Sequence, residues 1–311
     1  MTNKLFCDDT PGATVDPMMH SSYAIMGVTG QVGGVVARTL LTSQQPVRAI
    51  VREAGKGEPW KQRGCEVAVA DIGDAATLTH AFQGAEGVFI LPPPVFDPSP
   101  DFSEARATAM ALRSALEAAR PRRVVYLSTI GAQAGESNLL TQHTIIEQAL
   151  GDLAMPVTFL RPAWFMENSL WDVAPAREQG VIPSFLQPLD KLVPMVATAD
   201  IGRVAASLLQ ETWSGRQVVE LEALKRVTPN EIAATFAQLL GRPVRAEAVP
   251  RATWEELFKS QGVKNPAPRI RMLDGFNEGW IEFERGSARS QYGTVTLETV
   301  LKSLLEREAQ P

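Results

Sequence analysis

Short apolar segments alternate with longer amphipathic segments through the first half of the chain. The short segments are apolar at almost every position, instead of alternating between apolar and polar residues. That pattern is typical of parallel strands that helices cover on both faces of a sheet. The predicted strands are Tyr23–Met26, Val47–Val51, Glu66–Ala70, Gly87–Leu91, Val124–Leu127 and Val157–Leu160.

The segments between these strands carry apolar residues at helical spacing and end in helix signals. Asp74 is a good N-cap, Pro121 stops a second helix, and Gly151 ends a third. The predicted helices are Val35–Thr42, Ala75–Phe82, Asp101–Arg120 and Leu139–Leu150. These β/α repeats predict an α/β fold with a Rossmann-type, doubly wound parallel sheet.

The second half is less regular. Thr228 and Glu231 form a capping box with Pro229 at the first helical position, which predicts a helix to about Leu240. Further helices are expected after Asp200 and around Trp254–Ser260, Ile270–Phe283 and Leu297–Leu305, and further strands at Gln217–Leu221 and Val244–Val249.

The 311 residues exceed a typical domain of about 150 residues. We expect a polar, disordered tail over residues 1–21 and a Rossmann-type domain over residues 22–160. A smaller α/β lobe is expected over residues 161–311, with part of 190–222 returning to the main sheet.

The composition excludes several classes of function. The net charge is −5, so a basic surface for direct nucleic-acid binding is not expected. No apolar stretch reaches the length of about 18 residues that a membrane span needs. Cys7 and Cys65 are too few for a disulfide framework and indicate a reducing, cytoplasmic compartment. His20, His80 and His143 lack the spacing of metal ligands, so no metal site is expected.

The sharpest motif is the glycine-rich sequence between the first strand and the following helix. It reads Gly27-Val28-Thr29-Gly30-Gln31-Val32-Gly33. Gly27 permits a tight turn, Gly30 permits close approach of a pyrophosphate, and Gly33 permits close packing of the helix. A purely structural glycine turn is the alternative. The strand–loop–helix context favours a nucleotide site, because free N–H groups and the positive end of the helix attract phosphate.

Arg52 stands 19 residues after Gly33, at the end of the second strand. An acidic residue here typically holds the ribose 2′-hydroxyl of NAD, whereas arginine suits the 2′-phosphate of NADP. Lys56 is close enough in sequence to join Arg52. Two alternatives remain: Glu53 turns inward, or both cations are solvated loop residues. The sequence therefore favours NADP(H) over NAD(H).

Residues at the ends of the third and fourth strands complete the predicted cofactor edge. Asp71 is placed to accept the adenine amino group and Ile72 to cover the ring, unless Asp71 only caps the next helix. Leu91 and Pro92 begin a stiff proline loop, because prolines cannot continue a strand ladder. Ligands of open α/β sheets bind at this carboxyl edge.

Four motifs, in this order, resemble the NmrA-like branch of the atypical short-chain dehydrogenase/reductases. They are the glycine loop, Leu127–Ala132, Arg161–Asn168 and Ala199–Ala205. The resemblance runs from about Ser22 to the last helix and is weaker beyond Arg226. It implies a Rossmann domain that binds NADP(H) and a small C-terminal lobe over the nicotinamide. The branch includes NAD(P)H:quinone reductases, reductases of plant phenolics and non-catalytic redox-sensing regulators.

The fifth and sixth strands end in residues that fit this arrangement. Ser128 and Thr129 are expected to touch the cofactor, or only to form hydrogen bonds at the strand end. Pro162, Ala163 and Trp164 are expected to line the nicotinamide face. The predicted substrate pocket consists of Phe165, Met166 and Asn168, and the apolar wall continues through Trp171, Phe185 and Met195.

The chain departs from the wider family at the catalytic residues. Ordinary short-chain dehydrogenases carry a tyrosine with a lysine four residues later, and no tyrosine here has such a partner. Reductases of this branch often carry a lysine four residues before a glutamate on the helix after the fifth strand. His143 precedes Glu147 at that spacing, so the resemblance places His143 beside the nicotinamide ribose.

The role of His143 stays open between three possibilities. The Glu147 carboxylate, one turn away on the same helix face, would favour a protonated imidazole. That imidazole would serve as a proton donor or as a hydrogen-bond donor to the ribose. The alternative is a histidine without any catalytic role.

The missing tyrosine–lysine pair favours some acceptors over others. Hydride transfer to a ketone gives an alkoxide that needs a positioned acid, whereas a quinone gives a phenolate with a pKa of about 10 that water can protonate. We expect an oxidoreductase that passes hydride from NADPH to a quinone or a similar small conjugated acceptor. The alternatives are a non-catalytic redox sensor that acts through a protein partner, and an epimerase or lyase that retains the cofactor. We expect a monomer or homodimer with no membrane or nucleic-acid partner.

Overall fold

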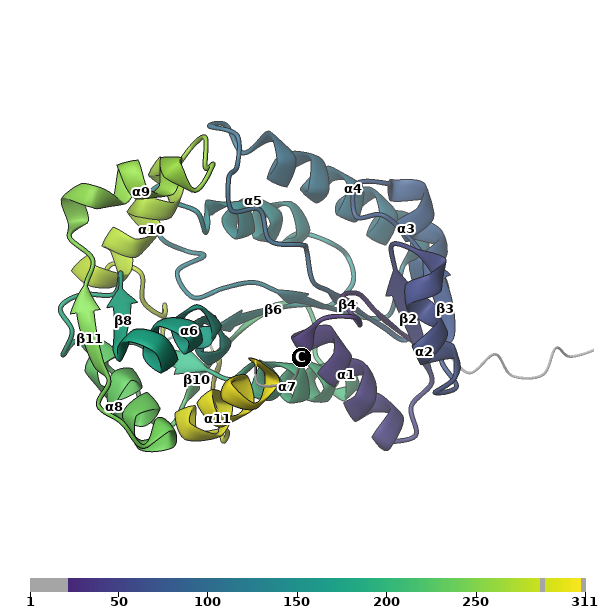
Figure 1. The fold of residues 1–311 in the computed structure, drawn as a ribbon. Helices are drawn as coiled ribbons and strands as arrows, with labels where there is room; N and C mark the ends of the chain where they lie inside the picture. The colour runs from purple at the N-terminus through teal and green to yellow at the C-terminus, as the bar shows by residue number, and fades with distance from the viewer. Residues whose placement is uncertain (1–21, 286–288, 309–311) are drawn as a thin grey trace, which may run out of the picture.

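The chain folds around one parallel sheet of eight strands in the order β12-β10-β6-β5-β4-β1-β2-β3 (Figure 1). The computed structural model describes residues 22–285 and 289–308, so the predicted tail, with Cys7 and His20, lies outside the described residues. Strands 3-2-1-4-5-6 follow the doubly wound order. The predicted fold class is therefore confirmed.

The six strands predicted in the first half all form, and their ends differ from the prediction by no more than two residues. They are β1 (Tyr23–Ile25), β2 (Val47–Val51), β3 (Glu66–Val69), β4 (Gly87–Ile90), β5 (Val124–Leu127) and β6 (Val157–Pro162). Two more strands, β10 (Arg216–Ala223) and β12 (Arg289–Gly293), extend the sheet beyond β6. All pairings within this sheet are parallel, so the carboxyl ends of the strands meet at one edge.

Helices cover both faces of the sheet, as its apolar strands require. On one face lie α1 (Gln31–Thr42) and α7 (Thr198–Gln210), and on the other α3 (Ala75–Phe82), α4 (Ser103–Ala119) and α5 (Thr141–Leu150) (Figure 1). A short helical turn, η1 (Ala54–Gly57) and α2 (Glu58–Lys61), follows β2.

Two predicted cap structures are confirmed. Asp74 caps α3, because its carboxylate accepts hydrogen bonds from the N–H groups of Ala76 and Thr77. At α8 (Pro229–Leu240), the Glu231 N–H donates to the Thr228 hydroxyl at 3.0 Å, and the Thr228 N–H donates to the Glu231 carboxylate at 2.8 Å. Such boxes satisfy N–H groups that a helix start otherwise leaves free.

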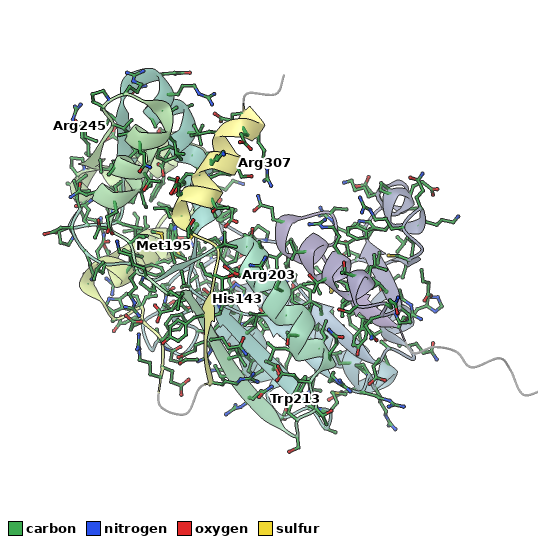
Figure 2. The ribbon with its side chains drawn as sticks, turned by 90° about the horizontal axis from the view of Figure 1, so that it is seen from below. His143, Met195, Arg203, Trp213, Arg245 and Arg307 are labelled. Carbon is green, nitrogen blue, oxygen red and sulfur yellow. The ribbon has the colours of Figure 1, made fainter. Side chains whose placement is uncertain are left out.

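The rest of the second half forms a lobe beyond β6 and β10. Two small parallel ribbons join β7 (Trp164–Phe165) to β9 (Met195–Val196) and β8 (Val181–Ser184) to β11 (Arg245–Ala248). The helices are α6 (Leu170–Gln179), η2 (Met166–Ser169), α8, η3 (Arg251–Thr253), α9 (Trp254–Ser260), α10 (Ala267–Glu278) and α11 (Leu297–Glu308). Figure 2 shows Arg245 and Arg307 on this lobe and His143 near the centre of the molecule.

Three predicted boundaries are wrong, each for a local reason. The first helix begins at Gln31 instead of Val35, directly after the Gly30 turn. The helix predicted to reach Phe283 ends at Glu278, because Gly279 has a φ of +94°, which continues no right-handed helix. Since α7 begins at Thr198, Asp200 lies inside its first turn instead of before it.

Candidate cofactor and active site

The glycine loop forms a tight, close-packed turn between β1 and α1. Gly27 has a φ of +68°, and the Gly30 N–H donates to the Gly27 carbonyl at 2.9 Å. A Cβ on Gly33 would lie 2.4 Å from the Gly27 carbonyl oxygen and 2.5 Å from that of Met26, so no larger residue fits. Thr29, Gly30 and Gln31 are exposed, and Val32 is buried beneath them. The first N–H groups of a helix lack intrahelical acceptors. The loop is therefore an open anion cradle that fits a pyrophosphate.

Arg52 and Lys56 differ in their surroundings at the end of β2. Lys56 Nζ lies 2.9 Å from Glu53 Oε1, and both side chains are exposed. The Glu53 carboxylate therefore points along the surface, and the pair with Lys56 holds its pKa below the usual range. Among the described residues, the exposed Arg52 side chain has no hydrogen bond or ion pair. Arg52 is free to meet a phosphate at this edge, whereas Lys56 must first leave Glu53.

The residues after β3 and β4 lie at the same carboxyl edge of the sheet, and those after β4 lie beside the glycine loop. Exposed Asp71 accepts a hydrogen bond from the Gly73 N–H at 2.8 Å, and half-buried Ile72 packs on the core. A Cβ on Gly27 would lie 3.1 Å from Leu91 Cδ2, so the end of β4 lies directly beside the loop. Leu91 and Pro92 are both half-buried there.

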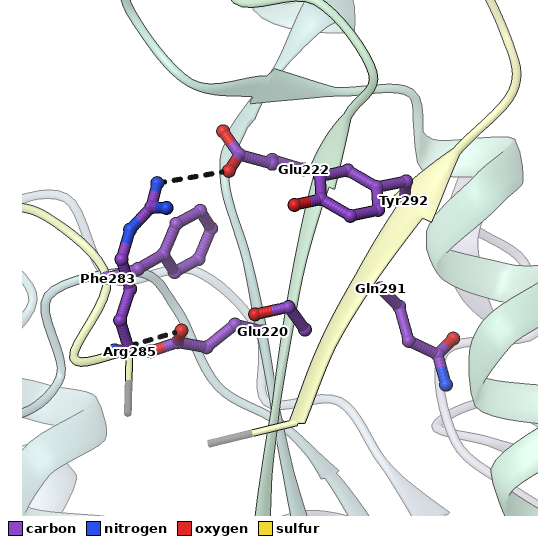
Figure 3. A pocket seen from close by; sticks show the side chains of 7 residues that line it. Glu220, Glu222, Phe283, Arg285, Gln291 and Tyr292 are labelled. Carbon is purple, nitrogen blue, oxygen red and sulfur yellow. Dashed lines mark hydrogen bonds and ion pairs between the residues drawn. The ribbon is translucent and has the colours of Figure 1, made fainter. Parts of the chain in front are cut away.

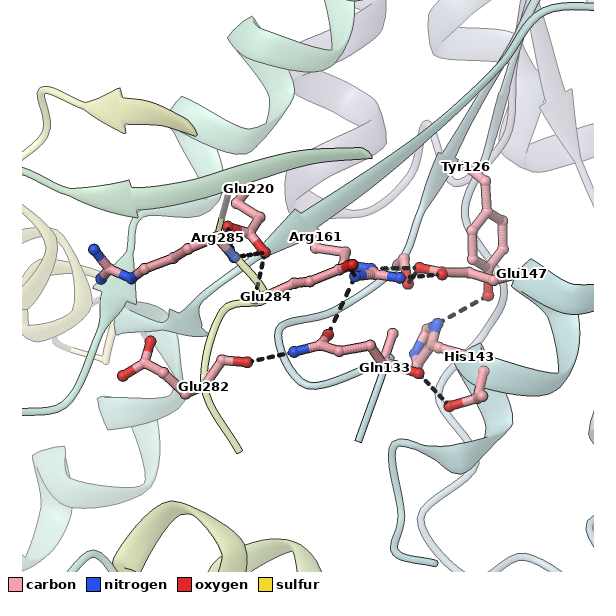
Figure 4. Close-up of polar contacts among 12 residues, drawn as sticks. Tyr126, Gln133, His143, Glu147, Arg161, Glu220, Glu282, Glu284 and Arg285 are labelled. Atoms are coloured by element: carbon pink, nitrogen blue, oxygen red, sulfur yellow. Dashed lines mark hydrogen bonds and ion pairs between the residues drawn. The ribbon is translucent and has the colours of Figure 1, made fainter. Parts of the chain in front are cut away.

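Ser128, at the end of β5, is buried and turns its hydroxyl into the protein. Its Oγ donates to Glu147 Oε1 at 2.5 Å, and Arg161 on β6 binds both oxygens of the same carboxylate (Figure 4). The Ser128 hydroxyl proton is thus engaged within the core. Thr129, the next residue, is half-buried.

His143 lies in the first turn of α5, and its half-buried ring faces the sheet. Its Nδ1 lies 2.8 Å from the hydroxyl of Tyr126 on β5 (Figure 4). Burial lowers the pKa of His143 to about 4. The expectation that Glu147 favours a protonated imidazole is therefore wrong, because the Glu147 charge is paired with Arg161 instead. At neutral pH the His143 imidazole is neutral.

The segment Ile281–Arg285, here called the strap, fastens the lobe to this region (Figure 4). The Gln133 amide donates to the Glu282 carbonyl at 2.7 Å, and Arg161 Nη1 donates to Glu284 Oε2 at 2.8 Å. A Cβ on Gly131 would lie 2.8 Å from Ile281 Cγ2. The strap therefore packs directly on the loop that follows Ser128 and Thr129.

Two carboxylates of β10 hold the other side of the strap. Glu220 accepts hydrogen bonds from the N–H groups of Glu284 and Arg285, at 2.7 and 3.2 Å, and Glu222 accepts one from the Arg285 guanidinium at 3.4 Å. Burial raises the pKa of Glu220, against the opposing effect of these bonds. The space between them and β12 is only about 10 Å³, about one water molecule (Figure 3). This carboxylate cluster therefore secures the strap and leaves space for no more than about one water molecule.

Pro162, the last residue of β6, and the residues after it separate into two groups. Pro162 and Ala163 are buried at the sheet edge, and half-buried Trp164 packs edge-to-face on Phe276 with ring centroids 5.1 Å apart. Phe165 is half-buried and Asn168 is exposed. Met166 instead lines a separate cavity of about 400 Å³ between α8 and residues 293–298.

The predicted apolar wall is wrong for Met195 and stays a prediction for Phe185 and Trp171. Half-buried Phe185 packs against the buried rings of Trp254 and Phe258 of the lobe core, with centroids 5.5 and 5.3 Å away. Met195 is 2% exposed. Trp171 is 82% exposed, so it offers the most accessible face of the three.

Three polar residues link the glycine loop to the lobe, and sequence reasoning missed two of them. Thr198 Oγ1 lies 2.6 Å from Glu167 Oε1 and 3.1 Å from the side-chain amide oxygen of Gln31. The Thr198 N–H also donates to Glu167, at 2.9 Å, which caps the start of α7. Glu167 stands inside the motif Arg161–Asn168, but only the fold reveals its partner Thr198.

Asp172 is a further titratable residue that no sequence signal distinguished. It lies in the first turn of α6, where burial raises the pKa of its carboxyl to about 7, despite a hydrogen bond with Ser169. An acidic residue in a first helical turn is ordinary in sequence. Its burial depends on the packing of the lobe.

The described part of the chain has neither a metal-type cluster nor a membrane-type helix. Among residues 22–285 and 289–308, no three histidine, cysteine or acidic side chains converge as metal ligands. None of the helices in the same residues has the length and apolarity needed to cross a membrane.

The family follows from a match over most of the chain. The sequence model of the NmrA-like family matches residues 19–291. The chain belongs to the NmrA-like family. This NmrA-like protein is 31% identical to the NAD(P)H azoreductase of Xenophilus azovorans, over 82% of this chain and 84% of that protein. It is 29% identical to quinone oxidoreductase 2 of Escherichia coli strain K12, over 77% of this chain and 82% of that protein.

Solved structures share the fold of this NmrA-like protein. The NADPH-dependent quinone oxidoreductase of Escherichia coli, complexed with NADPH, is 25% identical and has a TM-score of 0.71, with 92% of this chain and 99% of that chain covered. The triphenylmethane reductase of Citrobacter sp., complexed with NADP(H), is 23% identical and has a TM-score of 0.75, with 91% and 100% covered.

Proposed function

We propose that this NmrA-like protein is an NAD(P)H-dependent oxidoreductase that uses NADPH to reduce a quinone or a similar conjugated acceptor. One observation carries the proposal: the close-packed Gly33 and the exposed start of α1 form a pyrophosphate cradle beside the carboxyl edge of the sheet. The names of the relatives, an azoreductase and a quinone oxidoreductase, support the same reaction class.

The residues proposed to hold the cofactor follow the carboxyl edge of the sheet. The pyrophosphate would meet the loop, the adenine would lie near the end of β3, and the nicotinamide near the ends of β5 and β6. These residues are Gly27, Thr29, Gly30, Gln31, Val32, Gly33, Arg52, Lys56, Asp71, Ile72, Leu91, Pro92, Ser128, Thr129, His143, Pro162, Ala163 and Trp164.

The preference for NADPH rests on Arg52. An unpaired guanidinium at the end of β2 binds a 2′-phosphate through two parallel N–H groups, which Lys56 does not reproduce. Glu53, the acidic residue nearby, is paired with Lys56 on the surface. The Glu53 carboxylate therefore contacts Lys56 and makes no ion pair with Arg52, although the Arg52 charge also helps to lower its pKa.

The acceptor class follows from the proton chemistry of the site. NADPH supplies a hydride when bound. His143 is neutral at pH 7, so it offers an N–H donor but no readily lost proton. A phenolate-type product with a pKa of about 10 tolerates such a site, whereas an alkoxide product does not.

Cofactor binding and turnover, measured together, test this function. We expect NADPH to bind more tightly than NADH and to be oxidised when a substituted benzoquinone or naphthoquinone is added. Tight binding of both the oxidised and the reduced cofactor with no turnover would contradict the proposed enzymatic activity and indicate a redox sensor. Absence of any nicotinamide binding would contradict both.

A further inference from the structure

The buried hydroxyl of Tyr126 has one polar partner among the described residues, the Nδ1 atom of His143. The two atoms lie 2.8 Å apart, and the ring centroids lie 5.9 Å apart. Tyr126 is wholly buried on β5, whereas His143 is half-buried at the start of α5. The imidazole is therefore anchored to the sheet through Nδ1, and Nε2, on the opposite edge of the ring, faces away from β5.

We propose that Tyr126 is a positioning residue that holds His143 as the neutral imidazole with its proton on Nε2. The consequence for catalysis rests on the proposed function: this tautomer presents an N–H donor at the nicotinamide end of the cofactor site. The tautomer itself follows from the contacts of the two side chains alone.

The direction of the hydrogen bond decides the tautomer. If the Tyr126 hydroxyl donates to Nδ1, its proton is satisfied and the imidazole proton lies on Nε2. If Nδ1–H donated instead, the hydroxyl proton would be buried without an acceptor, which costs about 1–3 kcal/mol. Tyr126 does not avoid this cost by losing its hydroxyl proton, because burial and the Glu147 charge raise the pKa of Tyr126 well above 10.

The charges around the ring leave this arrangement undisturbed. The charged groups nearest on the packed elements are Glu147, one turn further along α5, and Arg161 on β6, and these two pair with each other. Ser128 supplies a third hydrogen bond to the same carboxylate. A second proton on His143 would have to enter at Nδ1 and displace the Tyr126 proton. The lowered pKa of His143 also favours the neutral imidazole.

The experiment is nuclear magnetic resonance of the imidazole nitrogens, recorded on the full chain without cofactor. Long-range ¹H–¹⁵N correlations report which ring nitrogen carries the proton. The spectrum of His143→Gln assigns the His143 signals, and the exposed His80 serves as an internal reference. We expect a proton on Nε2 and a bare Nδ1 that stay unchanged between about pH 8 and pH 5, well below the usual titration near 6.5. A proton on Nδ1 in the unmodified protein would overturn the proposal without any variant.

Tyr126→Phe removes only the hydroxyl and tests its role directly. We expect His143 in this variant to show mixed tautomers, because the hydroxyl that fixes the proton on Nε2 is gone, while burial still keeps its titration midpoint below about 6.5. The matched control is Tyr292→Phe, because Tyr292 is 53% exposed and lies on β12. His143 signals that are the same in both variants would overturn the proposal.

A cofactor measurement separates this proposal from the proposed function. We expect Tyr126→Phe to weaken NADPH binding about two- to tenfold, the range for one hydrogen bond, and Tyr292→Phe to leave it unchanged. Lack of NADPH binding by the unmodified protein would refute the proposed function. The tautomer, measured without cofactor, would be judged by its own spectrum.

Discussion

The guanidinium of Arg161 binds both carboxylate oxygens of Glu147, with 2.6 Å between Nη2 and Oε2 and 2.9 Å between Nε and Oε1. Their side chains are only 6% and 9% exposed. The contact joins β6 to α5 across the face of the sheet, and Arg161 continues to Glu284 on the strap. It also neutralises the carboxylate nearest His143, which leaves the imidazole uncharged.

Removing Arg161 should destabilise the protein strongly. Arg161→Met leaves the buried Glu147 carboxylate without its cation, and breaking such a pair costs about 3–5 kcal/mol. Urea denaturation measures the loss. The control is Lys259→Ala, since the Lys259–Glu255 pair is exposed and should contribute less than about 1 kcal/mol. Equal stability of the two variants would refute the structural role of the buried pair.

Arg52 should set the choice between the two nicotinamide cofactors. Arg52→Ala is expected to weaken NADPH binding by about 1.5–3 kcal/mol, the range for hydrogen bonds to charged groups, and to change NADH binding little. Fluorescence titration of the bound cofactor measures both affinities. Lys56→Ala should have a smaller effect, because Lys56 is already paired with Glu53. Equal weakening for both cofactors would place the 2′-phosphate elsewhere.

Gly33 should tolerate no side chain. An added methyl group would lie 2.4 Å from the Gly27 carbonyl oxygen and must displace the loop. With local strain of about 1–3 kcal/mol, Gly33→Ala should lower NADPH affinity about tenfold. Gly135→Ala is the control, because its Cβ would meet nothing within 4 Å. Unchanged affinity in Gly33→Ala would rule out the cradle.

Asp172 should make stability fall as pH rises. Burial raises its pKa to about 7, so the folded state favours the protonated carboxyl, whereas the unfolded chain ionises near its ordinary value of 3.8. This stabilisation is complete below about pH 4 and lost as pH rises through about 7. Asp172→Asn should therefore be more stable than the unmodified protein at pH 8, by as much as about 3 kcal/mol, with the difference shrinking toward pH 4.

Thermal or urea unfolding across that pH range measures the difference. The control is Asp190→Asn, because Asp190 is exposed. It should leave the pH dependence of stability unchanged. A constant difference between Asp172→Asn and the unmodified protein would show that the carboxyl is solvated.

Local signals were sufficient for the strands of the first half and for the glycine loop. Buried parallel strands must be apolar on both faces, so segments such as Val124–Leu127 are visible without knowledge of their neighbours. The Thr228 box is equally local, because its partners lie three residues apart. By contrast, β12 has the polar sequence Arg-Ser-Gln-Tyr-Gly and forms only because β10 offers a free edge.

The chemistry around His143 required contacts that sequence spacing does not reveal. Tyr126 lies on a different element from His143, and Arg161 on yet another. The sequence spacing correctly predicted that His143 and Glu147 lie on one helix. It could not show that Arg161 pairs with the Glu147 carboxylate, so that Glu147 does not favour a protonated His143 ring. The strap is more remote still, since Glu284 meets Arg161 across more than a hundred residues of sequence.

Hydride transfer is the most direct test of the proposed reaction. NADPH, unlabelled or deuterated at both C4 positions of the nicotinamide, would be mixed rapidly with the protein and a benzoquinone, and the loss of reduced nicotinamide followed. We expect one quinone to be reduced for each NADPH oxidised, a slower reaction with the deuterated cofactor, and a clear preference for NADPH over NADH. Firm binding of NADPH that no quinone can oxidise would contradict it.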